Sequence, residues 1–206
     1  MGAERAARVV SMLVPGAQAA VALWLAWRSL DWPLIHDAPI MHYIAWRIAE
    51  GAVPYRDLFD MNFPGTYLVH LAVVTLLGAG DAAWRAVDLG VTAITAVLVA
   101  ALAAPWGRAA AFGGASFFAA YHLAAGAWNA GQRDFLLCPC LLAAALGVAR
   151  WAEGGGLRPV FGGGVALGAG LTIKPHAIVF LAALLAFIAV RGRVTLVPPL
   201  PAMAAL

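Results

Sequence analysis

The stretch of sequence that decides the fold runs from His36 to Thr66 and reads HDAPIMHYIAWRIAEGAVPYRDLFDMNFPGT. It carries four carboxylates, Asp37, Glu50, Asp57 and Asp60, whereas the segments on both sides of it are apolar enough to enter a bilayer. Charged side chains are costly to keep beside a membrane, so their presence suggests a use. We therefore expect the functional site in this stretch and membrane-spanning helices around it.

The composition indicates a polytopic membrane protein. The 206 residues are 64% hydrophobic and only 11% charged, and the mean hydropathy is +0.87. The net charge is +3, but the 13 Lys and Arg residues are mostly single residues that flank apolar runs rather than a clustered basic stripe. We therefore expect membrane lipids as partners and exclude nucleic acid.

Apolar runs between charged residues predict eight candidate spans. They lie at about 9–27, 66–79, 86–104, 109–127, 135–150, 159–172, 177–190 and 195–206. The last run stops without a polar tail, so we expect residues 1–206 to be the N-terminal part of a longer transmembrane domain, truncated at its C-terminus. The expected fold class is all-α, a polytopic transmembrane helical bundle with short amphipathic surface helices in the first outward loop.

Arginines at alternate turns predict which loops share a side of the membrane. They are Arg5, Arg8, Arg108, Arg150, Arg158, Arg191 and Arg193. The positive-inside rule assigns these turns to the cytoplasm, so the loops with Asp37, Asp134 and Lys174 face outward. This holds only if the segment 66–79 does not cross the bilayer. If it crosses, Asp134 cannot share a site with Asp37; the basic turns favour the non-crossing alternative.

A surface helix is predicted directly after Asp37. Pro39 is typical of a helix start, and Gly51 is typical of the residue that ends one. Four apolar residues share one face at helical spacing: Ile40, Tyr43, Ile44 and Ile48. Asp37 has two compatible interpretations, a functional carboxylate beside the membrane or an N-cap of this helix.

A series of short motifs extends over nearly the whole chain. It consists of Asp37, Tyr43, Ala45, Gly51, Pro54-Tyr55-Arg56-Asp57, Pro64-Gly65, Leu76-Leu77-Gly78, Arg85, Gly107-Arg108, Asp134 and Leu171-Thr172-Ile173-Lys174. In order and spacing this series resembles the GT-C superfamily of membrane glycosyltransferases. The resemblance is to the branch that depends on polyprenyl-phosphate sugars and includes protein mannosyltransferases and aminoarabinose transferases.

The resemblance implies a catalytic carboxylate pair, Asp37 and Asp134. Asp37 is expected as the general base that takes the acceptor proton while the acceptor oxygen attacks the anomeric carbon with inversion. Arg56 and Lys174 are expected to hold the polyprenyl phosphate. The alternatives are structural: Asp134 paired with the adjacent Arg133 at a helix end, and Arg56 and Lys174 as interfacial anchors.

Further substrate contacts are expected from Tyr43, Tyr55, Asp57 and Asp60. The two carboxylates would orient Arg56 or bind the acceptor, and the alternative is that they are solvated loop charges. The implied partners are a polyprenyl-phosphate sugar donor and a lipid, glycan or protein acceptor. No cofactor is predicted, because Arg and Lys alone can stabilise a monophosphate leaving group, and nothing in the sequence supports a divalent metal.

The resemblance places the protein in a bacterial inner membrane with its active site facing outward. Two other functions stay open. A small-molecule transporter would place ionisable residues at mid-span, where only Asp88 stands out in this chain. A catalytically inert truncated scaffold is the third alternative.

Overall fold

The computed structural model describes residues 2–196, and the side chains of residues 10–191. Its α-helices are α1 Gly2–Arg28, α2 Ala38–Ala49, α3 Pro64–Leu76, α4 Asp81–Ala103, α5 Arg108–Ala124, α6 Ala127–Ala130, α7 Arg133–Ala152, α8 Arg158–Ile173 and α9 Ile178–Leu196. Two 3-10 turns, η1 Ala104–Trp106 and η2 Pro175–Ala177, connect some of them. No β-strand occurs among the described residues, which confirms the predicted all-α class.

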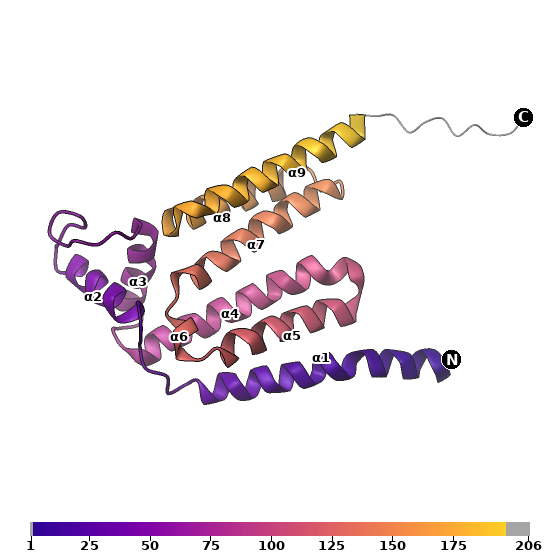
Figure 1. Ribbon diagram of the computed structural model, residues 1–206, viewed down its shortest axis with the longest axis horizontal. Helices are drawn as coiled ribbons and strands as arrows, with labels where there is room; N and C mark the ends of the chain where they lie inside the picture. Colours follow the sequence, from indigo (N-terminus) through magenta and orange to yellow (C-terminus); the bar gives the residue numbers. More distant parts are fainter. Residues whose placement is uncertain (1, 197–206) are drawn as a thin grey trace, which may run out of the picture.

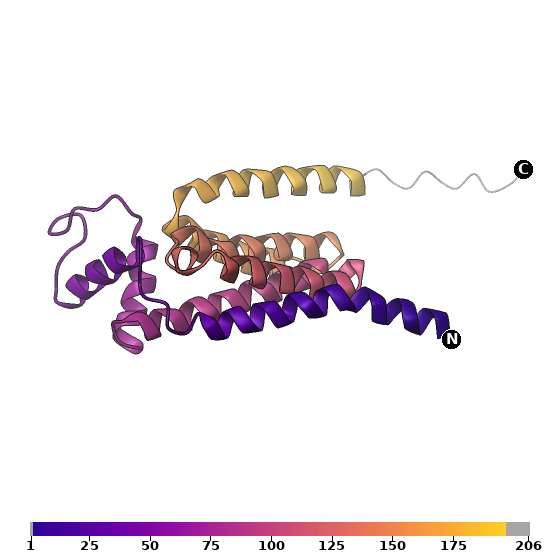
Figure 2. The same ribbon diagram turned by 60° about the horizontal axis from the view of Figure 1, so that its bottom comes forward.

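The long helices run side by side along the longest axis of the molecule (Figure 1). One group contains α1, α4 and α5, and the other contains α7, α8 and α9, with α4 packed against α7. The short helices α2 and α3 pack against each other at the end of the bundle where α1 ends and α4 begins. The turned view in Figure 2 also shows α2 and α3 at one end of the long helices.

Helix α3 does not extend along the bundle. It has 13 residues and is therefore roughly 20 Å long, which is short of a hydrocarbon core about 30 Å thick. Because α1 arrives at the same end from which α4 departs, the chain between them stays at that end (Figure 1). The starts of α2 and α7 and the end of α8 therefore lie together, as in the non-crossing alternative.

Among the described residues, three segments are long and apolar enough to cross a membrane. They are Val10–Arg28, Asp81–Trp106 and Arg133–Ala152. Helices α5 and α8 are shorter, with 17 and 16 residues, and return along α4 and α7. The predicted span 195–206 lies outside the described residues from position 197 onward.

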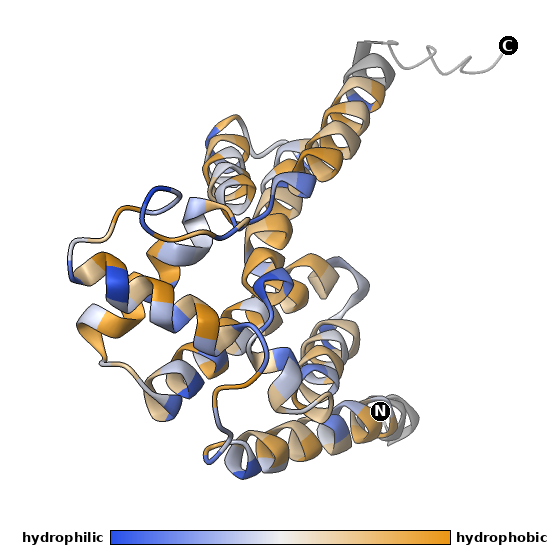
Figure 3. Ribbon diagram, turned by 60° about the vertical axis from the view of Figure 1, so that its left-hand side comes forward, coloured by the Kyte–Doolittle hydropathy of each residue, from blue (hydrophilic) through white to orange (hydrophobic). Residues whose placement is uncertain are grey.

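Hydrophobic residues predominate along the long helices, whereas hydrophilic residues gather in the loops near α2 and α3 (Figure 3). Exposed large apolar side chains include Val14, Leu23, Val97, Phe161 and Val179. An exposed apolar belt of this kind suits contact with lipid chains.

The apolar face predicted for the surface helix is divided in the structure. Ile44 is buried, whereas Ile40 and Tyr43 are about half exposed. The buried side of α2 instead includes Met41 and His42, because α2 packs against α3 rather than only against the membrane. The predicted face is therefore used in two ways, with Ile44 packed inside the protein and Ile40 and Tyr43 exposed, and its contact with the membrane surface stays a prediction.

One hydrophobic cluster fixes the end of the bundle that carries the charges. It takes one buried residue from each of five helices: Ala38, Val73, Trp84, Leu136 and Ile173. Asp37, Asp134 and Lys174 each lie one or two residues from a member of this cluster. The apolar packing that joins the five helices therefore also brings these three charged residues together.

Candidate active site

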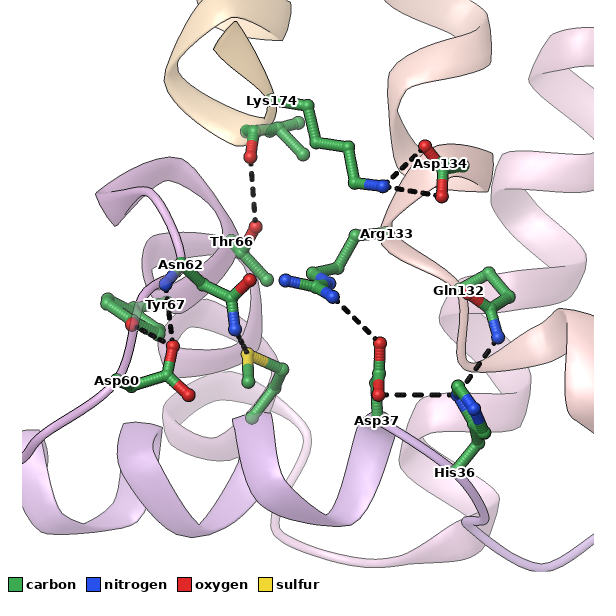
Figure 4. Close-up of polar contacts among 12 residues, drawn as sticks. His36, Asp37, Asp60, Asn62, Thr66, Tyr67, Gln132, Arg133, Asp134 and Lys174 are labelled. Atoms are coloured by element: carbon green, nitrogen blue, oxygen red, sulfur yellow. Dashed lines mark hydrogen bonds and ion pairs between the residues drawn. The ribbon is translucent and has the colours of Figure 1, made fainter. Parts of the chain in front are cut away.

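Two ion pairs join the start of α7 to the neighbouring elements (Figure 4). The Nη2 of Arg133 donates to Oδ2 of Asp37 at 2.9 Å. The Nζ of Lys174 donates to both carboxylate oxygens of Asp134 at 2.6 Å. Because Arg133 and Asp134 are consecutive, the four residues form one cluster of alternating charges, which we call the charge cluster: Asp37, Arg133, Asp134 and Lys174.

The charge cluster is partly shielded from solvent. The exposed fractions of the Asp37, Arg133 and Lys174 side chains are 24%, 22% and 22%, whereas Asp134 is 58% exposed. The Nε of Arg133 is buried and has no hydrogen-bond partner among the described residues. Partial burial strengthens electrostatic interactions while leaving the groups within reach of a ligand.

Asp37 does not use its side chain to cap α2. It occupies the N-cap position, but its carboxylate makes no cap hydrogen bond. It faces Arg133 instead, and its Oδ1 lies 3.3 Å from Nδ1 of His36. The interpretation of this carboxylate as a helix cap was therefore wrong.

Arg133 likewise does not pair with the residue next to it. Consecutive side chains on a helix do not face each other, so Arg133 points to Asp37 and Asp134 points to Lys174. His176 lies further from Asp134, with its Nε2 at 3.8 Å. The structure therefore replaces the predicted local pair with two contacts between distant parts of the chain.

A close backbone approach places Arg133 beside Asp37. A Cβ atom added to Gly131 would lie 2.9 Å from the backbone oxygen of Ile35 and 3.1 Å from Cβ of Ala38. Only a residue without a side chain lets the loop before α7 pack this closely on the start of α2. Trp84 reinforces the contact, because its Nε1 donates to the backbone oxygen of Ala130 at 2.8 Å.

Gly131→Ala is expected to lower the stability of the protein. The added methyl group must push the loop away from α2, and overpacking of this kind costs about 1–3 kcal/mol. Thermal unfolding in detergent should therefore shift to lower temperature. Gly90→Ala is the matched control, because nothing lies within 4 Å of its Cβ position. Thermal unfolding of Gly131→Ala at the wild-type temperature would contradict this close approach.

Arg56 lies in the loop between α2 and α3 and pairs with its neighbour rather than with the charge cluster. Its Nε and Nη2 donate to the two oxygens of Asp57 at 2.9 and 2.8 Å, and the Arg56 side chain is 71% exposed. The Arg56 guanidinium and the Val53 amide lower the pKa of the Asp57 carboxyl to about 2. This pair raises the pKa of Arg56 in turn.

The other predicted substrate contacts belong to the same end of the molecule but have structural partners. Asp60 accepts hydrogen bonds from the Tyr67 hydroxyl at 2.6 Å and the Asn62 amide at 2.7 Å, so it holds the loop onto α3. The Tyr55 hydroxyl donates to the backbone oxygen of Asn62 at 2.6 Å. Tyr43 is 54% exposed and contacts Trp46. Whether these residues bind substrate stays a prediction.

A buried histidine pair was not predicted from the sequence. The Nδ1 atoms of His42 and His70 lie 2.8 Å apart, and the ring of His70 stacks on Trp84. Burial lowers the pKa of His42. The two residues are 28 positions apart and no local motif links them, so only the packing of α2 against α3 reveals the pair.

Asp88, the acid predicted within a span, is paired. Its carboxylate binds the buried guanidinium of Arg85, one turn earlier, and lies 3.3 Å from Nε2 of His122. The guanidinium of Arg85 also lies over the ring of Trp32 at 5.0 Å. The network joins α4 to α5 and to the chain after α1.

Comparison with known proteins identifies the family of the chain. Residues 64–206, more than half of the chain, match the dolichyl-phosphate-mannose-protein mannosyltransferase family. The match includes Asp134 and Lys174, whereas Asp37 precedes it. No curated protein and no solved structure matches the chain. The family match agrees with the helical membrane bundle and with the resemblance that the motifs indicate. The chain belongs to the dolichyl-phosphate-mannose-protein mannosyltransferase family and is a membrane glycosyltransferase of the GT-C type.

Proposed function

We propose that this protein transfers a sugar from a polyprenyl-phosphate-linked donor to an acceptor hydroxyl by an inverting single displacement. The observation that carries the proposal is the charge cluster, which brings two carboxylates and two cations from the starts of α2 and α7 and the end of α8 to one place. This chemistry needs a base for the acceptor and cations for the leaving phosphate. The cluster offers both.

In the proposed reaction Asp37 is the general base. Its carboxylate accepts the proton of the acceptor hydroxyl while the acceptor oxygen forms a bond to the anomeric carbon. The bond between that carbon and the phosphate oxygen breaks at the same time, and its electron pair leaves with the phosphate. Arg133, at 2.9 Å, and His36, at 3.3 Å, fix the position of the carboxylate.

Lys174 and Arg133 are the proposed cations for the leaving phosphate. Lys174 is a point charge, and Arg133 keeps a buried Nε donor that no described residue uses. Asp134 then acts as a positioning residue, because both of its oxygens hold Nζ of Lys174. Arg56 stays a candidate for the same phosphate, although its pair with Asp57 would first have to open.

The proposed orientation puts the charge cluster on the outer face of a bacterial inner membrane. Reporter fusions after Gly51, Arg108, Gly131 and Gly155 are expected to read outside, inside, outside and inside. The reason is that the turns after Gly51 and Gly131 lie at the end of the bundle that carries the cluster, whereas the turns at Arg108 and Gly155 lie at the other end. An inside signal at Gly131 would remove the two-carboxylate site.

The direct test is transfer from a polyprenyl-phosphate sugar. Membranes that contain the full-length protein are supplied with radiolabelled polyprenyl-phosphate mannose, and labelled products are separated from the donor. Product above the level of membranes without the protein supports the function. Its absence with every acceptor class, lipid, glycan and peptide, overturns this donor.

A further inference from the structure

A cleft opens between α5 and α7 next to the charge cluster. Its volume is about 530 Å³, within the range of small-molecule sites. Phe118, Tyr121 and His122 line it from α5, and Asp134, Phe135 and Cys138 line it from α7. The lining is completed by His36, Trp128, Asn129 and Gln132.

The cleft combines aromatic faces with hydrogen-bonding edges. Tyr121 and Trp128 are 67% and 55% exposed, so part of each ring is accessible to a ligand. The Asn129 and Gln132 amides carry both donors and acceptors. A sugar ring has the matching surface, because its C–H faces pack on aromatic rings and its hydroxyl groups bind amides and carboxylates.

The charge of the lining favours a neutral ligand. Among the described residues that line the cleft, none is Lys or Arg, and Asp134 contributes a carboxylate. A phosphate group would therefore find no Lys or Arg among the lining residues, and it is attracted instead to Arg133 and Lys174, which do not line the cleft. A neutral polyol without phosphate is the ligand that fits.

A series of close polar contacts connects the cleft to the proposed base. Gln132 Nε2 lies 3.0 Å from Nδ1 of His36 (Figure 4). This histidine nitrogen also lies 3.3 Å from Oδ1 of Asp37. His36 has a φ of 60°, a conformation that non-glycine residues rarely adopt, and its ring contacts Trp128 with a centroid distance of 3.6 Å. A ligand in the cleft would therefore lie beside the residues that position Asp37.

We propose that this cleft binds the acceptor, and that the acceptor is a saccharide whose terminal ring packs on Trp128 and Tyr121. The inference rests on the proposed function, since it names the acceptor of that reaction. A hydroxyl group at the edge of the bound ring would then lie toward His36 and Asp37. The donor phosphate would approach from the side of Arg133 and Lys174.

Saturation-transfer NMR tests the cleft without any transfer reaction. The probes are methyl α-D-mannopyranoside, methyl β-D-glucopyranoside and methyl α-D-arabinofuranoside, added to the full-length protein in lipid nanodiscs, because maltoside detergents themselves carry sugars. At least one glycoside should receive saturation at its ring C–H protons. Trp128→Ala is expected to weaken its binding roughly three- to tenfold, the effect of one aromatic contact.

The matched control is Trp106→Ala, which removes an exposed tryptophan at the opposite end of the bundle. It should bind the glycoside like the wild type. Tyr121→Ala, at an exposed position, provides a second cleft variant if Trp128→Ala does not fold. The absence of saturation for all three probes, or equal binding by the cleft variants and the control, overturns the saccharide site.

A second measurement distinguishes an acceptor site from a donor site. Glycoside saturation is measured again with saturating polyprenyl-phosphate mannose. An acceptor site keeps the signal, whereas loss of the signal means that the cleft holds the donor sugar and overturns the inference. Asp37→Asn should lower the transfer rate by roughly a hundredfold or more and leave glycoside binding intact. If the wild type binds the glycoside in the cleft but never transfers mannose, the donor assignment fails and the cleft does not.

Discussion

Asp37→Asn lowers the rate of sugar transfer by roughly a hundredfold to ten-thousandfold, the expected result of removing a general base. The protein should still insert and express at the wild-type level. The amide has nearly the same size as the carboxylate, but it cannot accept the acceptor proton. The measurement is transfer from polyprenyl-phosphate mannose by membranes that carry equal amounts of the wild type and the variant.

A purely structural role for Asp37 predicts a different outcome. Its carboxylate makes no helix-cap hydrogen bond, so the variant would lose only the partly exposed ion pair with Arg133, worth on the order of one kcal/mol or less. Thermal unfolding would shift slightly and turnover would stay within a few-fold of the wild type. Unchanged turnover would therefore remove Asp37 from catalysis.

Two substitutions control for the loss of a carboxylate at this end of the protein. The first is Glu50→Gln. Glu50 lies at the other end of α2, where its side chain pairs with Arg47 near the surface. Asp57→Asn disrupts the exposed pair with Arg56. Both should cost much less activity than Asp37→Asn. Asp60→Asn is a poorer control, because Asp60 accepts two hydrogen bonds that hold the loop onto α3.

The sequence predicts the helices well because lipid imposes a simple rule on them. A helix in a bilayer must be apolar over most of its length, so charges and glycines mark its ends. This rule predicted the core of α4 and of α7, and the glycine at position 51 correctly predicted where α2 stops. The rule could not predict whether α3 crosses the membrane, because the sequence of a 13-residue apolar helix resembles that of a short span. Only the positions of the neighbouring helices distinguish the two cases.

The partners inside the site were harder to predict than its members. Asp37, Asp134 and Lys174 come from three regions of the chain, and their common end follows from the alternation of turns. A pair between Arg133 and Asp134 is one alternative that the sequence leaves open, because adjacent opposite charges suggest a local pair, but the start of α7 turns the two side chains apart. Contacts of this kind depend on Gly131 and on the packing of α2, which no motif encodes.

Arg56 differs most plainly from its predicted role at the phosphate, because it pairs with the residue next to it. A guanidinium and a carboxylate that are adjacent in a loop, without a helix to separate them, can form a bidentate pair. The motif Pro54-Tyr55-Arg56-Asp57 therefore satisfies its own charges locally. The charge cluster instead joins residues that are almost a hundred positions apart in the case of Asp37 and Arg133.

Lys174→Gln is the second substitution with a large expected effect. If Nζ of Lys174 stabilises the negative charge that develops on the leaving phosphate, its loss should lower kcat by roughly a hundred- to thousandfold, as for other lost electrostatic contacts to a transition state. Lys174→Arg keeps the positive charge and should recover part of the activity. Arg47→Gln, a partly exposed arginine at the end of α2, is the control and should remain near wild type.

The alternative is that Lys174 only pairs with Asp134. That carboxylate is 58% exposed, and an exposed pair contributes about 0–1 kcal/mol, so Lys174→Gln would leave kcat within a few-fold of the wild type. The single variant Asp134→Asn and the double variant Asp134→Asn/Lys174→Gln separate the roles of the two residues. If Asp134 acts only by positioning Lys174, the double variant falls no further than Lys174→Gln alone, because residues that act as a unit are not additive. Additive losses would mean that Asp134 touches the substrate itself, and a near-normal kcat in all three variants would remove this ion pair from the mechanism.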